Sequence, residues 1–220
     1  MTKTFQDLKP LFLGLLIGVA LMLQCGRAEA GPREKITLAG GCFWCVEADF
    51  ESVPGVISAV SGFTGGQTKN PTYKQVKTGK TGHYEAVQIT FDAGKISRDK
   101  ILELFFRSID PTDAGGQFCD RGKPWRTAIF VSNKAQSAAA EKARSDAMKA
   151  LGRKIVTPIL AAQRFYPAED LHQNYYRGSK RVITRYGIKT QAAAYQRYRK
   201  ACGRDAKLKR LWGKNAAFAG

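Results

Sequence analysis

The sequence contains only two histidines, His83 and His172, and they lie in separate segments. Two histidines without a third neighbouring ligand do not define a metal site, so we expect no metal and no cofactor. A long apolar run is also absent, because the stretch from Leu11 to Leu23 has 13 residues and a bilayer needs roughly 20. The chain shows no repeat, low-complexity segment or interior linker. Its length of 220 residues and its hydrophobic fraction of 44% suit one domain with a sizeable core.

The first thirty residues differ from the rest of the chain. Lys3 and Lys9 precede the short apolar run, and Ala28-Glu29-Ala30 follows it. This order of basic, apolar and A-x-A segments is typical of a secretory signal peptide. We expect residues 1–30 to be removed after Ala30, which leaves residues 31–220 as a single catalytic domain in the periplasm or outside a bacterial cell. The alternative is an uncleaved N-terminal anchor, for which the run is short. After cleavage we expect no stable membrane insertion.

Acidic side chains are scarce, with 18 against 36 basic ones and a net charge of +18. Without residues 1–30 the charge is +17, and residues 177–214 contribute 13 basic side chains and one acidic side chain, Asp205. A basic segment of this kind can bind nucleic acid or anionic lipid. Export separates the protein from nucleic acid, so we expect no such partner. We interpret residues 187–220 as a basic C-terminal extension with a solvated surface.

The apolar pattern predicts an α+β fold. The expected order is strand, helix, strand, strand, helix and strand, which is a ferredoxin-like βαββαβ core with a mixed sheet in two layers. An extra helix and strand follow, then a further short helix, and beyond Tyr186 we expect a long, mostly irregular C-terminal tail. The predicted strands are 34–39, 56–63, 83–91, 127–131 and 154–160, and the predicted helices are 42–53, 98–109, 134–151 and 168–176.

Two long polar segments, 64–81 and 110–124, interrupt this pattern, and the first has a predicted helical turn near Tyr73. Loops of this length without structure of their own are usually functional. We therefore expect the site to lie at these two loops.

Cys42 stands where a strand ends, two glycines turn the chain and a helix begins. The amides of a first helical turn point at such a sulfur and favour the thiolate, so the pattern predicts a nucleophile. Four cysteines remain after cleavage: Cys42, Cys45, Cys119 and Cys202. Disulfides can form in an exported protein, but a core of this size does not require them. The alternative for Cys42 is a buried cysteine that packs as a small apolar side chain.

Glu85 follows Gly82-His83-Tyr84 and shares one face of a strand with Val87, Ile89 and Phe91. A carboxyl at the edge of an apolar face is desolvated, which raises its pKa and allows it to act as a general acid. The alternative is a glutamate at a strand end that points into solvent. The pattern alone leaves both open.

Seven segments in order resemble the A-type peptide methionine sulfoxide reductases. They span most of residues 35–180, and seven motifs in order are far more specific than Cys-Phe-Trp alone. The segments are Gly41-Cys42-Phe43-Trp44, Gly62-Phe63-Thr64-Gly65-Gly66, Asn70-Pro71-Thr72-Tyr73, Gly82-His83-Tyr84-Glu85, Gln117-Phe118-Cys119-Asp120-Arg121-Gly122, Arg126-Thr127-Ala128-Ile129-Phe130 and Ala168-Glu169-Asp170-Leu171-His172-Gln173.

The resemblance implies a thiol-dependent reduction of methionine S-sulfoxide, free or in a peptide, and hence repair of oxidised proteins. Cys42 attacks the sulfoxide sulfur, Glu85 protonates the oxygen and Tyr73 donates a second hydrogen bond. The product is methionine, and Cys42 is left as a sulfenic acid that an intramolecular disulfide resolves. Phe43 and Trp44 form the wall around the S-methyl group, while Asp120 holds water and polar groups. The implied partner is a thioredoxin-like or other dithiol donor, and we expect a monomer.

Three features depart from the family pattern. Trp125 stands where the family usually has a second tyrosine and offers an N–H donor but no hydroxyl, so we place it with the substrate-binding residues. Cys45 replaces a frequent glycine, and the tail around Cys202 resembles an extension of only part of the family. Three thiols could resolve the sulfenic acid. We favour Cys202, because a flexible tail reaches the site and nearby basic residues favour its thiolate. Cys45 is the alternative.

A second interpretation is a thioredoxin-like thiol–disulfide oxidoreductase that uses Cys42-x-x-Cys45. The loop that carries Tyr73 and the strand that carries Glu85 have no role in disulfide exchange, which argues against it. A third, non-enzymatic interpretation is a basic module for acidic surfaces, and it depends on the C-terminal extension alone.

Overall fold

The computed structural model describes residues 31–220, so the predicted signal peptide lies outside the described residues. Six strands form one sheet in the order β7-β6-β1-β3-β2-β8. All neighbouring strands are antiparallel except β6 and β7, which are parallel, and the predicted mixed sheet is confirmed. The strands are β1 (Arg33–Gly40), β2 (Val56–Thr64), β3 (Tyr84–Asp92), β6 (Thr127–Val131), β7 (Ile159–Ala161) and β8 (Tyr166–Pro167).

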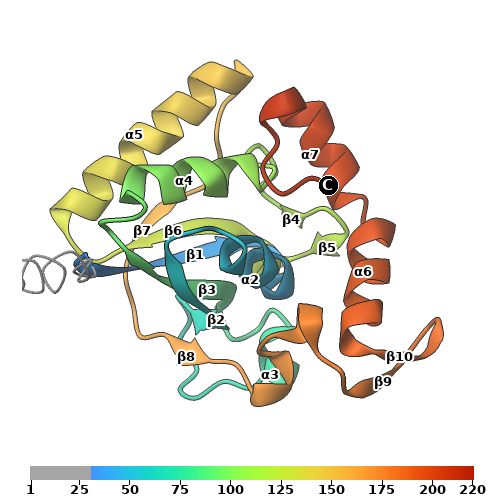
Figure 1. The fold of residues 1–220 in the computed structure, drawn as a ribbon. Helices are drawn as coiled ribbons and strands as arrows, with labels where there is room; N and C mark the ends of the chain where they lie inside the picture. Colours follow the sequence, from blue (N-terminus) through green and yellow to red (C-terminus); the bar gives the residue numbers. More distant parts are fainter. Residues whose placement is uncertain (1–30) are drawn as a thin grey trace, which may run out of the picture. The chain divides into compact units, whose positions relative to one another are not determined.

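Three helices pack together with the sheet, which confirms the α+β fold in two layers (Figure 1). They are α2 (Phe43–Glu51), α4 (Arg98–Arg107) and α5 (Lys134–Leu151). Their apolar faces share one core with alternate residues of the strands, such as Leu38 and Ile89. The other face of the sheet has a smaller cluster around Tyr84 and Phe130. The predicted caps form, since Ser97 accepts a hydrogen bond from the amide of Lys100 and α5 ends at the left-handed Gly152.

The two long loops contain short elements that place side chains at the sheet edge. The predicted turn near Tyr73 is α3 (Tyr73–Val76), which Thr72 caps. Residues 110–124, predicted as a loop, include the two-residue strands β4 (Gly116–Gln117) and β5 (Asp120–Arg121), which pair with each other, and the start of η1 (Lys123–Trp125).

Two predicted elements differ from the structure. The strand predicted at 154–160 reduces to β7, because only residues 159–161 pair with β6. The helix predicted at 168–176 is wrong. The chain there forms two 3₁₀ turns, η2 (Asp170–His172) and η3 (Tyr175–Arg177), separated by Asn174 in a left-handed conformation that no α-helix contains.

The prediction of a mostly irregular tail beyond Tyr186 is also wrong. A hairpin of β9 (Arg181–Thr184) and β10 (Gly187–Thr190) leads into α6 (Gln191–Ala201), α7 (Arg204–Trp212) and η4 (Gly213–Asn215). The helices form because a few side chains, including Tyr195, Leu208 and Trp212, are buried against the domain. The other positions of α6 and α7 are largely basic, so these two segments of the sequence show no broad apolar stripe. Within residues 31–220, no helix combines the length and hydropathy needed to cross a membrane.

Candidate functional site

Cys42 is the N-terminal cap of α2, directly after β1 and the glycine turn. Gly41 has a φ of +82°, and a Cβ there would lie 2.5 Å from Cβ of Gln117, so this turn requires glycine. The Cys42 carbonyl accepts hydrogen bonds from the amides of Cys45 and Val46 at 3.1 and 3.3 Å. The turn therefore fixes Cys42 at the helix start, as predicted, and its side chain is buried.

Glu85 lies on β3 and its side chain is 1% exposed. One carboxylate oxygen accepts from the amide of Phe43 at 3.1 Å, and the other accepts from Nε1 of Trp125 at 2.8 Å. Burial raises the pKa of Glu85 to about 8, although both hydrogen bonds favour the charged form. The carboxyl is thus mainly protonated at neutral pH, next to the residue that follows Cys42 in the chain.

An aromatic wall surrounds the start of α2. Trp44 stacks on Tyr175 with ring centroids 3.8 Å apart, and Phe43 lies 5.9 Å from Tyr73. His172 contacts three of these rings, at 4.3 Å from Tyr73 and at 5.6 and 5.7 Å from Phe43 and Trp44. Trp44 Nε1 and His172 Nδ1 are buried without a hydrogen-bond partner. The wall is therefore apolar with two unsatisfied polar atoms, which suits a ligand that is partly polar.

Tyr73 reaches this wall from the first long loop. Its amide donates to the Glu169 carboxylate at 3.1 Å, which ties α3 to the segment before η2. Burial raises the pKa of the Tyr73 hydroxyl, and the charges of Glu85 and Cys42 raise it further. The hydroxyl stays protonated at any physiological pH and is therefore a hydrogen-bond donor.

Asp120 lies on β5 in the second long loop. Burial raises its pKa, and its carboxylate accepts a hydrogen bond from the hydroxyl of Tyr198 on α6. The Tyr198 ring also meets Trp44 edge-on, with centroids 6.3 Å apart. The C-terminal extension therefore closes one side of the site, which the sequence did not indicate.

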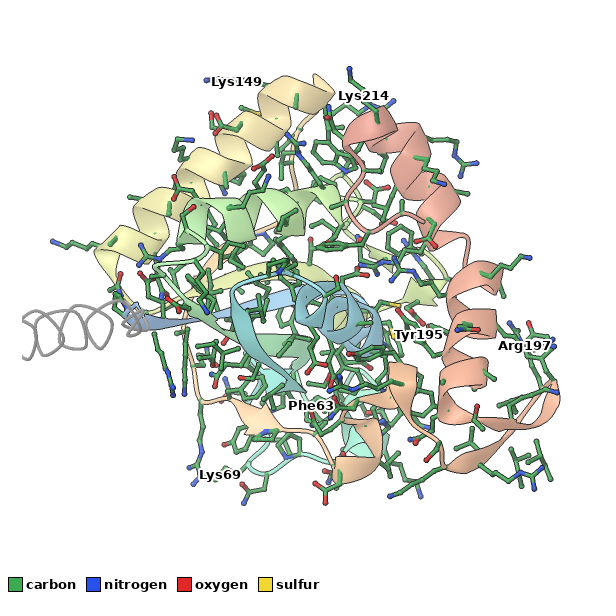
Figure 2. All side chains as sticks on the ribbon, in the orientation of Figure 1. Phe63, Lys69, Lys149, Tyr195, Arg197 and Lys214 are labelled. Carbon is green, nitrogen blue, oxygen red and sulfur yellow. A yellow bond between two sulfur atoms is a disulfide. The ribbon has the colours of Figure 1, made fainter. Side chains whose placement is uncertain are left out.

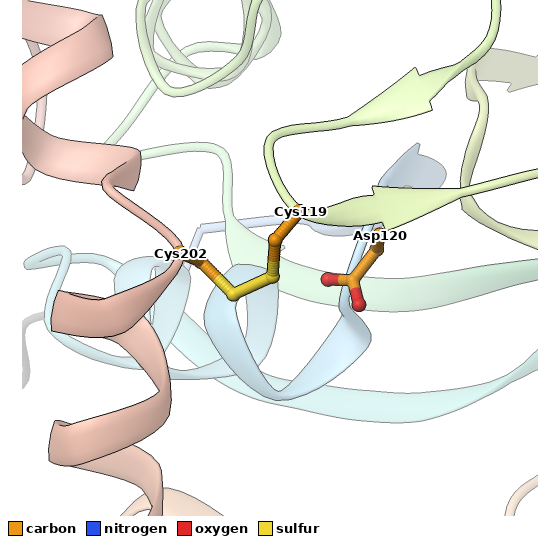
Figure 3. Close-up of side chains that lie close together, drawn as sticks. All are labelled: Cys119, Asp120 and Cys202. Atoms are coloured by element: carbon orange, nitrogen blue, oxygen red, sulfur yellow. A yellow bond between two sulfur atoms is a disulfide. The ribbon is translucent and has the colours of Figure 1, made fainter.

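The four cysteines form two pairs. Cys119 and Cys202 are joined by a disulfide with a Cα–Cα distance of 4.9 Å (Figure 3). Cys42 and Cys45 are free thiols. The prediction that Cys202 lies in a flexible tail is wrong. Cys202 is the C-terminal cap of α6. Cys119 lies in the turn between β4 and β5. The end of α6 lies beside this turn, so Cys202 meets Cys119.

The two free thiols, Cys42 and Cys45, differ in their pKa. A hydrogen bond with Cys45 and burial raise the pKa of Cys42 well above its ordinary value, with smaller effects from Glu85 and Asp120. The same hydrogen bond and two arginines, Arg204 and Arg199, lower the pKa of Cys45. Without substrate, ionisation of Cys45 is therefore favoured over ionisation of Cys42. The helix start predicts a thiolate at Cys42, but without substrate the hydrogen bond with Cys45 and the burial of the thiol act against it, and the acidic neighbours add to this effect.

All the predicted site residues except Cys202 and Cys119 therefore gather around the start of α2. Sequence reasoning missed Tyr175 and Tyr198, since neither lies in a motif, and it considered His172 only as a metal ligand. Within residues 31–220 the one cluster of side chains with metal-ligating atoms is Cys119, Asp120 and Cys202, and its two sulfurs are bonded to each other.

The chain is similar to known proteins over nearly its whole length. Residues 34–204 match the family described as peptide methionine sulfoxide reductase. A peptide methionine sulfoxide reductase MsrA 2 of Caulobacter vibrioides is 47% identical over 84% of this chain and 89% of its own length. The protein of the same name from Rhizobium meliloti is 43% identical over 96% of this chain and 97% of its own.

Solved structures show the same fold. The methionine sulfoxide reductase A of Corynebacterium diphtheriae matches with a TM-score of 0.61 and 32% identity, over 67% of this chain and 75% of its own. The reduced form of Mxr1 from Saccharomyces cerevisiae matches with a TM-score of 0.62 and 29% identity, over 65% of this chain and 83% of its own.

Proposed function

The chain belongs to the peptide methionine sulfoxide reductase family, and from this premise we infer how its own residues perform the reaction. The protein is an oxidoreductase that reduces methionine S-sulfoxide to methionine through a cysteine sulfenic acid and an intramolecular disulfide. A general thiol–disulfide oxidoreductase is not favoured, because Cys42 and Cys45 lie beside a protonated carboxyl that disulfide exchange does not use.

The first step needs a nucleophile and a proton donor. The sulfur of Cys42 attacks the sulfoxide sulfur, and the protonated Glu85 and the Tyr73 hydroxyl stabilise the oxygen as its charge develops. The thiol proton of Cys42 replaces the proton that Glu85 gives to the oxygen. The substrate S–O bond and the transient bond between the two sulfurs then break as the oxygen passes to the Cys42 sulfur, so methionine leaves and Cys42 becomes a sulfenic acid. The observation that carries this assignment is the buried Glu85, which accepts hydrogen bonds from both Phe43 and Trp125 and yet stays protonated.

The first prediction tests the nucleophile. Cys42→Ser should abolish methionine release while the thermal unfolding transition stays near that of the wild type, because a serine hydroxyl at this site is a poor nucleophile toward sulfur. Single-turnover release of methionine from dabsyl-methionine sulfoxide measures it. Turnover in Cys42→Ser above the trace level would assign the chemistry to another residue.

The second step removes the sulfenic acid. We propose that Cys45, hydrogen-bonded to Cys42, attacks it first, so that Cys42–Cys45 becomes a disulfide and water leaves. The bonded state of Cys202 with Cys119 supports this order over a direct attack by Cys202. The reduced outer pair then exchanges with the inner disulfide, which restores both inner thiols and leaves Cys119–Cys202 oxidised.

The position of the outer pair suits contact with a donor. Cys42 and Cys45 are buried, at 6% and 2% exposure, whereas Cys119 is exposed. The Cys119–Cys202 disulfide lines a surface hollow of about 320 Å³ with Asp113, Lys207 and Arg210. A dithiol donor such as a thioredoxin-like protein reaches an exposed disulfide far more readily than a buried one. We propose this hollow as the place where electrons enter.

The second prediction tests this order. Cys202→Ser should release about one methionine per enzyme and form the Cys42–Cys45 disulfide, then stall with thioredoxin as the donor, because the inner disulfide is buried. Dithiothreitol, a small dithiol, should restore turnover. Cys45→Ser should stop at the sulfenic acid, which dimedone labels. If Cys45→Ser forms a Cys42–Cys202 disulfide as fast as the wild type resolves its sulfenic acid, Cys202 is the resolving residue.

A further inference from the structure

One face of α2 carries both site thiols and a carboxylate. Cys42, Cys45 and Asp49 are spaced by three and four residues, so they follow one another along the helix on the same side. Cys42 and Cys45 pack against Ala194 and Tyr195 of the C-terminal extension. Figure 2 shows Tyr195 on the side of α6 that faces the domain and Arg197 on its outer side. The C-terminal helices therefore form one wall of the thiol pair.

Two arginine side chains of this extension form ion pairs with Asp49. Nη1 of Arg199 lies 2.7 Å from one Asp49 oxygen, and Arg199 also pairs with Asp205 at 2.8 Å. Nη2 of Arg204 lies 3.7 Å from the other Asp49 oxygen. Since Cys45 lies one turn before Asp49 on the same face, both guanidinium groups lie near its sulfur.

Arg204 is unusual for a cation. Its side chain is 2% exposed, and it donates to the carbonyls of Ser108 and Gly40 at 2.7 and 3.4 Å. Its Nε has no hydrogen-bond partner. A buried guanidinium that is incompletely paired is costly, so a structural role alone explains it poorly. Its field acts strongly on any nearby thiol, because little water screens it.

The two thiols therefore have different ionisable neighbours. On the side of Cys42 lie the carboxyl groups of Glu85 and Asp120, while on the side of Cys45 lie Arg199 and Arg204. The separation between them is a single helical turn. The hydrogen bond between the thiols is the largest cause of the higher pKa of Cys42 and the lower pKa of Cys45, and the two arginines lower the pKa of Cys45 further.

We propose that Arg199 and Arg204 are positioning residues that hold Cys45 as a thiolate, ready to attack the sulfenic acid of Cys42. This inference rests on the proposed role of Cys45 as the first resolving thiol. In the step, the Cys45 thiolate forms the S–S bond, the S–O bond of the sulfenic acid breaks, and the oxygen leaves as water after it takes one proton from solvent or Glu85. No other oxidant or reductant takes part.

The ionisation of Cys45 depends on charged and titratable groups from four elements, which are α2 with its N-terminal cap, β3, α6 and α7. The proposal requires that the arginines outweigh the acidic groups at Cys45, which the burial of Arg204 and the partial burial of Arg199 favour. These groups are Cys42 and Asp49 of α2, Glu85 of β3, and Tyr195, Tyr198, Arg199, Arg204 and Asp205 of the extension.

The test separates the two steps in the full-length protein. One equivalent of dabsyl-methionine sulfoxide is added, and quenched samples are analysed for methionine and, by mass spectrometry, for the Cys42–Cys45 disulfide. Arg204→Met should slow disulfide formation about tenfold at pH 7, as a loss of one pKa unit of thiolate stabilisation implies, and leave methionine release unchanged. The slowing should disappear as pH rises above about 9, since Cys45 then ionises without help.

Matched variants separate charge from structure. Arg204→Lys should resolve the sulfenic acid nearly as fast as the wild type, because it keeps the charge. Arg199→Met, at a less buried site, gives the same test if Arg204→Met does not fold. Arg197→Met removes a charge from the outer side of α6 and should change neither step. Equal slowing of both steps, or slowing that is the same at every pH, would overturn the proposal.

The Cys42–Cys45 disulfide of the wild type tests the resolving route, and its rate in the arginine variants tests the role of the arginines. If the wild type releases methionine and never forms a Cys42–Cys45 disulfide, the proposed resolving route is wrong. If that disulfide forms at the same rate in the wild type and in both arginine-to-methionine variants, only the role of the arginines is wrong.

Discussion

Glu85 shows how burial can outweigh hydrogen bonding at a single residue. Two donors, the amide of Phe43 and Nε1 of Trp125, stabilise its charged form, but a carboxyl with 1% exposure loses more through desolvation. Its pKa of about 8 makes it a proton donor at neutral pH. Trp125, which stands where the family usually has tyrosine, therefore contributes to the site by an N–H donor directed at the acid.

The third prediction concerns this proton. Glu85→Gln should lower the rate of methionine release by about 10²–10⁴, the usual loss when a general acid is removed. In the wild type the rate should fall as pH rises through about 8, because the carboxyl then loses its proton. Single-turnover rates between pH 6 and 10 measure both effects.

The matched control is Glu51→Gln, a change at the C-terminal end of α2. It should keep the wild-type pH profile. A Glu85→Gln variant that keeps the wild-type rate would remove Glu85 from the proton-donor role.

At the scale of elements, the C-terminal extension is part of the catalytic domain. Leu208 of α7 is fully buried in the main core, and Tyr198 and Arg199 of α6 reach Asp120 and Asp49. The disulfide between Cys202 and Cys119 adds a covalent link between the helices and the second long loop. The extension is thus both a wall of the site and the carrier of the outer thiol.

The fourth prediction tests how firmly this extension is held. Leu208→Ala should lower the free energy of unfolding by about 2–5 kcal/mol, because it leaves a cavity in the core. Urea unfolding followed by circular dichroism measures the change. Arg210→Ala, an exposed position on the same helix, should change it by less than about 0.5 kcal/mol. Equal stability of Leu208→Ala and the wild type would mean that α7 does not pack on the core in solution.

At the scale of the whole molecule, we propose that the protein is exported and works as a monomer in the periplasm or outside the cell. The order of basic, apolar and small residues in residues 1–30 supports export. Such a compartment permits disulfides such as Cys119–Cys202.

The fifth prediction follows from this proposal. After cell fractionation, Edman sequencing of the purified protein should give Gly31 as its first residue, and reductase activity should be found outside the cytoplasm. A cytosolic protein that begins at Met1 would contradict the proposal.

Local patterns in the sequence were sufficient to predict most strands, the main helices and the residues of the chemical centre. Strand alternation placed Glu85 on the same face as Val87 but left its burial open, and the two glycines placed Cys42 at a helix start, because both patterns are local. The family motifs added Tyr73 and Asp120. Local patterns failed for the extension, since its helices are held by few apolar residues and a buried arginine, which no periodicity reveals.

Only the tertiary structure decided which distant groups meet at the thiols. Cys119 and Cys202 are separated by 83 residues, Tyr198 and Asp120 by 78, and Arg199 and Asp49 by 150. The pairing of Cys202 with Cys119, and the different pKa shifts of Cys42 and Cys45, depend on these contacts. They arise because α6 and α7 pack beside the start of α2, and burial there sets the charge that each sulfur experiences.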